Sequence, residues 1–151
     1  MNNLDERIIE AARTVAGYSV LVVFESRASG RPRPTSDLDV AVLPTVAESE
    51  ARRRLQARLA VALADLAPDG RVDVVLLDEA PELLRQRIME SGRVLICDDP
   101  RAWRDLRVQT MREHGDREWA RELLRESQKK RLQQDVRDGR SRRAVVAPER
   151  A

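Results

Sequence analysis

Aromatic side chains are scarce in this sequence of 151 residues, which contains two Trp, one Tyr and one Phe. The core must therefore be built from Leu, Val, Ile and Ala. At this length we expect one globular domain that buries a sizeable core. The single cysteine, Cys97, excludes an internal disulfide framework and is typical of a protein in a reducing compartment.

Long apolar runs are also absent. No stretch approaches the roughly 18 consecutive apolar residues that are needed to span a bilayer. The first ten residues, MNNLDERIIE, lack the basic and apolar regions of a secretory signal. We therefore expect a cytoplasmic protein that does not associate with membranes.

Positive charge is carried almost entirely by arginine and is concentrated after residue 100. Residues 1–100 carry 13 basic and 17 acidic side chains, whereas residues 101–151 carry 15 basic and 9 acidic ones. A basic tail can contact nucleic acid or an acidic protein surface. A solvated charged helix has the same composition, so charge alone does not indicate DNA or RNA binding, and we expect none that is direct.

The apolar pattern predicts helices that alternate with strands. The expected elements are a helix over 4–16, strands over 18–24 and 38–43, a helix over 47–66, a strand over 72–77, a helix over 81–91, a strand over 93–97 and a charged helix from about 101 to 133. Asn3 is predicted to cap the first helix, and Gly92 to end the helix over 81–91 as a C′ glycine. The link between the first two strands is too short for a crossover helix, so that pair is expected to be antiparallel.

This order predicts an α/β fold, with a small mixed sheet of about four strands flanked by helices and a charged C-terminal helix. We expect residues 1–100 to form the sheet domain, residues 101–138 a helical extension and residues 139–151 a disordered tail.

Three acidic residues lie on the predicted strands. Asp37 and Asp39 are two apart and so project to one face of a strand, while Asp73 lies near the start of a later strand. If these strands are neighbours, three carboxylates converge, and a divalent cation such as Mg²⁺ is the economical counter-charge. Taken one at a time, each acid is better explained as a turn or strand-end residue in solvent.

The spacing of these residues resembles a known signature. Ser26, ten intervening residues and then Asp37-Leu38-Asp39 is similar to the Gly-Ser and D-x-D motif of the polymerase β-type nucleotidyltransferases. The segment SRASGRPRPTSDLDVAVL resembles the minimal (MNT) branch of that superfamily, and especially the MntA-like antitoxins that are partnered with HEPN-domain toxins. The resemblance covers roughly residues 15–98.

The resemblance implies a function and a set of site residues. Asp37, Asp39 and Asp73 would bind two Mg²⁺ ions, and Asp73 could accept the proton of the acceptor hydroxyl. Ser26 and Arg27 would hold the phosphates of a nucleoside triphosphate, expected to be ATP. The implied reaction is AMP transfer from ATP to a tyrosine of a partner HEPN toxin, which is thereby silenced.

The loop after the first strand departs from the family pattern in two places. Glu25 stands where the family usually has Gly, and Ser29 stands where MNT sequences often have Arg. Both changes make the expected triphosphate site less positive, and a Gly would also let the backbone approach phosphate more closely. Three hypotheses therefore remain open: an active protein adenylyltransferase, an antitoxin that neutralises its partner by binding alone, and a nucleotidyltransferase that acts on a small molecule.

Overall fold

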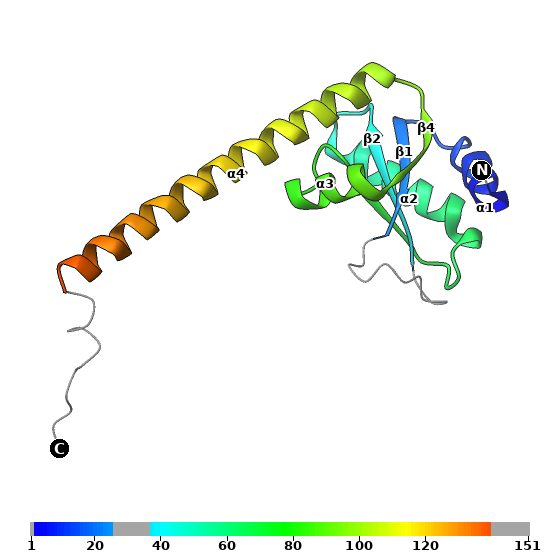
Figure 1. The fold of residues 1–151 in the computed structure, drawn as a ribbon. Coiled ribbons are helices and arrows are strands. Elements are labelled where there is room, and N and C mark those ends of the chain that lie inside the picture. Colours follow the sequence, from blue (N-terminus) through cyan, green and yellow to red (C-terminus); the bar gives the residue numbers. More distant parts are fainter. Residues whose placement is uncertain (1, 26–36, 140–151) are drawn as a thin grey trace. The chain divides into compact units, whose positions relative to one another are not determined.

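The computed structural model describes residues 2–25 and 37–139 of the chain. The elements in order are α1 (Asn3–Ala12), β1 (Tyr18–Phe24), β2 (Leu38–Pro44), α2 (Ser49–Leu63), the 3₁₀ helix η1 (Ala64–Leu66), β3 (Val72–Leu76), α3 (Glu82–Ser91), β4 (Arg93–Cys97) and α4 (Pro100–Arg137). Figure 1 shows them along the chain. The α/β fold predicted from the sequence is confirmed, with boundaries within a few residues of the predicted ones.

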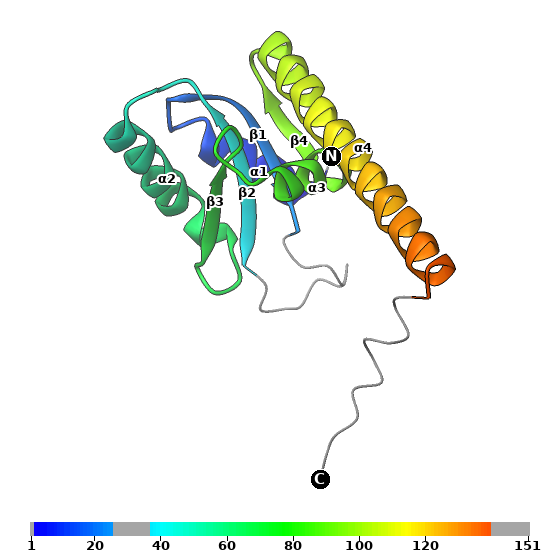
Figure 2. The same ribbon diagram turned by 90° about the vertical axis from the view of Figure 1, so that its left-hand side faces the viewer.

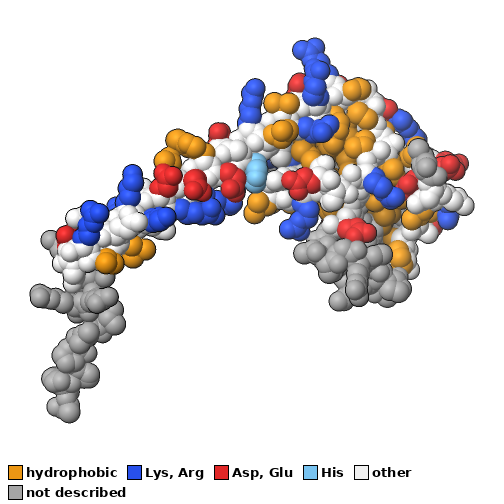
Figure 3. Space-filling model, viewed as in Figure 1, with side chains coloured by type: hydrophobic (Ala, Val, Ile, Leu, Met, Phe, Trp, Pro, Cys, Tyr) orange, Lys and Arg blue, Asp and Glu red, His pale blue; other side chains and the backbone are white. Residues whose placement is uncertain are grey.

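The chain divides into two compact units, residues 1–111 and residues 112–151. The first contains the sheet, α1 to α3 and the first turns of α4. The second contains the rest of α4, on which basic and acidic side chains are interspersed (Figure 3). None of the helices in the described ranges is long and apolar enough to cross a membrane.

The four strands form one mixed sheet in the order β3-β2-β1-β4 (Figure 2). β1 is antiparallel to both β2 and β4, whereas β2 and β3 are parallel. The predicted antiparallel pairing of the first two strands is therefore confirmed. The parallel pair is possible because the chain between β2 and β3 is long enough to cross the sheet through α2.

Each face of the sheet is covered by its own layer of helices. α1 and α2 cover one face and contribute Ile8, Leu55 and Leu59 to a core around Leu21 and Val40. α3 and the start of α4 cover the other face, where Ile88 and Leu106 pack on β1 side chains. Successive strand residues therefore enter different cores, which explains the nearly continuous apolar runs in β1 and β2.

Two predicted helix boundaries differ from the structure. The cap of α1 is Asn2 rather than Asn3, because the Asn2 side-chain oxygen accepts the backbone N–H of Asp5 at 2.7 Å. Gly92 ends α3 in an extended conformation, with φ −75°, and not in the left-handed one expected of a C′ glycine. Glycine is required there by close packing: a Cβ would lie 2.4 Å from the Ile88 carbonyl oxygen and 2.5 Å from Val22 Cγ1.

Candidate active site

Asp39 and Asp73 are direct neighbours across the parallel β2–β3 pair. Side chains opposite each other on adjacent strands point to the same face, and the strands lie about 4.8 Å apart. Asp39 is 9% exposed, whereas Asp73 is exposed. The carboxylates could converge only if the strands of Asp39 and Asp73 were neighbours. The structure shows that they are.

The carboxylates lie on the face of the sheet that α3 and the start of α4 cover. Asp39 pairs with Phe24 of β1, and Phe24 belongs to the core on that face. Further along β2, Ala41 occupies the same face and is fully buried. The face thus changes from apolar to acidic toward the ends of β1, β2 and β3 that meet near residue 39, so a site for charged ligands borders a packed core there.

Asp37 lies at the outer limit of this site. It is exposed, directly precedes β2, and shares the strand parity of Asp39. No group of three or more His, Cys, Asp or Glu side chains in residues 2–25 and 37–139 is already arranged as a metal site. The strand register therefore fixes the Asp39–Asp73 pair, whereas the place of the Asp37 side chain beside it stays a prediction.

The residue chemistry nevertheless fits a hard divalent cation. Carboxylate oxygens are the ligands that Mg²⁺ prefers, usually one or two from the protein together with substrate phosphates. Asp39 and Asp73 offer such a pair from two rigid strands, at the border of a packed core.

Glu25, the residue that departs from the family pattern, follows β1 directly and is exposed. Its neighbour Phe24 is the residue that pairs with Asp39. Glu25 therefore adds a further negative charge at the same end of the sheet. The predicted phosphate-binding residues Ser26 and Arg27 lie outside the described residues.

Arg71 is a residue of this site that the sequence pattern alone did not single out. Its carbonyl oxygen accepts the N–H of Leu38 at 3.1 Å, which continues the β2–β3 ladder by one residue. Arg71 directly precedes β3 and is two residues before Asp73, so strand alternation favours the carboxylate face for its side chain. Counting back by two from Asp73 would have found it.

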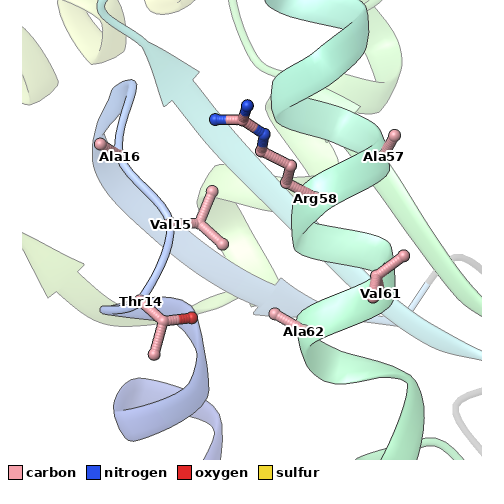
Figure 4. A pocket seen from close by; sticks show the side chains of 7 residues that line it. All are labelled: Thr14, Val15, Ala16, Ala57, Arg58, Val61 and Ala62. Carbon is pink, nitrogen blue, oxygen red and sulfur yellow. The ribbon is translucent and has the colours of Figure 1, made fainter.

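Another hollow of the first unit lies elsewhere. A shallow groove between the segment after α1 and helix α2 is lined by small and apolar side chains and by Arg58 (Figure 4). Its lining residues are Thr14, Val15, Ala16, Ala57, Arg58, Val61 and Ala62. Because α1 and α2 cover the opposite face of the sheet, this groove is separate from the carboxylates.

Comparison with known protein families identifies the fold. The model of the family "Polymerase beta, Nucleotidyltransferase" matches residues 6–101, which include all four strands and both carboxylates of the Asp39–Asp73 pair. The chain belongs to this nucleotidyltransferase family. No curated protein matches the chain.

Several solved structures of toxin–antitoxin systems are similar to the chain. One, a toxin–antitoxin with AMP-PNP, is 26% identical with a TM-score of 0.57, over 82% of this chain and 96% of that one. A second, a tri-AMPylated HEPN toxin from Shewanella oneidensis in complex with its MNT antitoxin, is 25% identical with a TM-score of 0.56, over 82% and 94%. A mutant of the toxin–antitoxin MntA–HpeT is 26% identical with a TM-score of 0.58, over 84% and 97%. The resemblance to the MntA-like branch that was inferred from the motif is therefore confirmed.

Proposed function

We propose that the chain is a protein adenylyltransferase that transfers AMP from ATP to a tyrosine of a partner HEPN toxin. The observation that carries the proposal is the cross-strand pair of Asp39 and Asp73 within a nucleotidyltransferase fold. Two similar structures support the choice of nucleotide and acceptor, because one contains AMP-PNP and the other an AMPylated HEPN toxin.

The carboxylates would hold the metal and prepare the acceptor. Asp37, Asp39 and Asp73 would bind Mg²⁺, two ions in the family pattern, which would supply charge stabilisation at the transferred phosphoryl group. Asp73, on the edge strand of the sheet, is exposed and is the candidate that accepts the proton of the acceptor hydroxyl. The tyrosine oxygen would then bond to the α-phosphorus as the bond to the bridging oxygen breaks, and pyrophosphate would leave.

Positive side chains would bind the phosphates. Strand alternation favours the carboxylate face for Arg71, so its guanidinium is proposed to contact the α-phosphoryl group beside the metals. Ser26 and Arg27 remain the predicted ligands of the β- and γ-phosphates. Arg71 thus supplies positive charge on the β3 side of the site, opposite the strand that leads to Ser26.

A second candidate function follows from Glu25. Its exposed carboxylate adjoins the end of β1, where the family pattern has Gly before the phosphate-binding Ser. A negative side chain at that position opposes triphosphate binding, which favours an antitoxin that neutralises its partner by contact alone. The two functions differ in whether AMP is transferred.

One labelling experiment separates them. The full chain is incubated with a candidate HEPN toxin partner, Mg²⁺ and ATP labelled either at the α- or at the γ-phosphate. Adenylyl transfer labels the partner only from α-labelled ATP, and Asp39→Asn abolishes the label. Asp65→Asn, which changes an exposed acid of η1, is the matched control and retains it. A tight complex that never becomes labelled would reject the transferase in favour of the binding-only antitoxin.

A further inference from the structure

The carboxylate site borders an edge of the sheet, because β3 is the last strand on its side. In a parallel pair, alternate residues bond to the neighbouring strand. The carbonyl of Arg71 accepts the N–H of Leu38 at 3.1 Å, and the N–H of Leu77 donates to the carbonyl of Val42 at 2.8 Å. Odd-numbered residues of β3 therefore bond to β2, and the backbone groups of the even-numbered ones point outward.

Most of the outward carbonyl groups already have partners. The side-chain amide of Gln56 donates to the Val74 carbonyl at 2.9 Å, and the N–H of Glu79 donates to the Leu76 carbonyl at 3.1 Å. For Val72, neither the carbonyl nor the N–H has a hydrogen-bond partner among residues 2–25 and 37–139. Within the part of the chain that the structure describes, the edge is thus closed toward α3 and open beside Asp73.

We infer that this open end of β3 is the docking edge for the acceptor, which binds as an extended segment paired antiparallel to Val72. The inference rests on the proposed function and adds how the acceptor is held. Unpaired strand edges bind extended peptides through main-chain hydrogen bonds. Val72 supplies one donor and one acceptor for such a pair, and the N–H of Val74 supplies a second donor.

This pairing would bring a tyrosine to the carboxylates. The residue opposite Asp73 on the added segment points to the same face of the sheet, with its Cβ about 5 Å away. A tyrosine at that position is long enough to reach across β3, so its hydroxyl lies over Asp73 and Asp39. Binding through the backbone positions the acceptor without a pocket for its side chain.

Pairing through the backbone also restricts the acceptor segment. Its paired positions must donate and accept main-chain hydrogen bonds, so the segment is an extended one without proline.

Amide hydrogen exchange measured by NMR on the full chain, with and without the HEPN partner, tests the docking edge directly. The Val72 and Val74 amides should exchange at least about tenfold more slowly in the complex, whereas those of Asp73 and Val75 are bonded to β2 in both states. A complex that leaves the Val72 and Val74 exchange rates unchanged would overturn the inference. If the Val72 and Val74 amides are already protected from exchange in the isolated chain, and more so at higher protein concentration, the edge binds a second copy of the chain. That result would also overturn the inference.

Kinetics of two variants give an independent readout. Val72→Pro removes the outward N–H at an edge position where proline is tolerated, and Val72→Ala loses the same side chain but keeps the N–H. Relative to Val72→Ala, Val72→Pro should raise KM for the partner about tenfold and leave KM for ATP unchanged. Equal KM values for the partner would contradict the edge. If the wild-type chain binds its partner and transfers no label, the proposed transferase fails, and the exchange data alone decide the docking edge.

Discussion

Asp39 on β2 and Asp73 on β3 occupy one rung of a parallel ladder, with the first carboxylate buried and the second exposed. Two acids in this relationship repel each other in the absence of a cation. The chain belongs to a nucleotidyltransferase family, and in the proposed reaction this pair would hold a divalent cation. The relationship gives rise to opposite expectations for stability and for activity.

We expect Asp73→Asn to stabilise the metal-free chain and to abolish transfer. Removing a like charge directly across the ladder relieves roughly 0.2–1 kcal/mol of repulsion. If Asp73 binds metal as proposed, its loss costs several kcal/mol of transition-state stabilisation, or on the order of a thousandfold in rate. Melting temperature in chelator and transfer rate in Mg²⁺ measure the two effects.

The double variant Asp39→Asn with Asp73→Asn distinguishes a shared metal site from two independent roles. Residues that act as a unit lose little more together than singly. We therefore expect the double variant to be about as inactive as either single one. Rate losses that multiply would argue against a common metal.

Glu25→Gly should lower KM for ATP at least about tenfold. The exposed carboxylate adjoins the strand end where the triphosphate is proposed to bind, and a like charge a few ångströms away costs roughly 1–4 kcal/mol, depending on the local dielectric. Glu25→Gln is the matched variant, since it removes the charge but keeps the side chain. If Gln has no effect and Gly does, close backbone approach rather than charge is the cause.

Arg71→Ala should slow transfer by about 10- to 100-fold, since charge-assisted hydrogen bonds contribute roughly 1.5–3 kcal/mol. Arg71→Lys should restore only part of the rate because an ammonium lacks the planar fork of the guanidinium. Arg53→Ala, which changes an exposed arginine of α2, is the control. Single-turnover rates at saturating ATP decide the question, and equal rates for Arg71→Ala and Arg53→Ala would remove Arg71 from the site.

Tyr18→Phe should remove an alkaline loss of stability. Burial raises the pKa of the Tyr18 hydroxyl, which donates to the Ala12 carbonyl. A group whose pKa is raised by folding contributes stability below its ordinary pKa, near 10, and that contribution is lost as the pH rises through the folded value. Urea unfolding at increasing pH should therefore show a decline above about pH 10 in the wild type that is smaller in Tyr18→Phe. Tyr18 is the only tyrosine, so tyrosinate absorbance reports its ionisation directly.

The local apolar pattern of the sequence predicted the helices and strands better than it predicted their arrangement in the fold. β1 and β4 have the bounds expected from the sequence, because each is a short run rich in β-branched or aliphatic residues that ends at a polar or turn-forming residue. The strand order, with β3 and β4 at the edges, depends on pairing between distant segments and could not be derived from periodicity. Counting back by two from Asp73 could have suggested Arg71, but its backbone bond to Leu38 depends on the register with β2.

Gly92→Ala should destabilise the chain although alanine adopts the backbone conformation of residue 92 without strain. The sequence suggested that this glycine was chosen for a left-handed turn, but its φ is −75° and the constraint is space. An added Cβ would meet the Ile88 carbonyl oxygen at 2.4 Å and Val22 Cγ1 at 2.5 Å, and both atoms belong to the packed junction of α3 and β1. Overpacking of this kind costs roughly 1–3 kcal/mol, measurable by urea unfolding.

Gly115→Ala is the matched control, because nothing lies within 4 Å of its Cβ and alanine favours helix there by up to about 1 kcal/mol. Equal stabilities for Gly92→Ala and the wild type would show that α3 and β1 can separate to admit a methyl group, so that their junction is less tightly packed than the structure indicates.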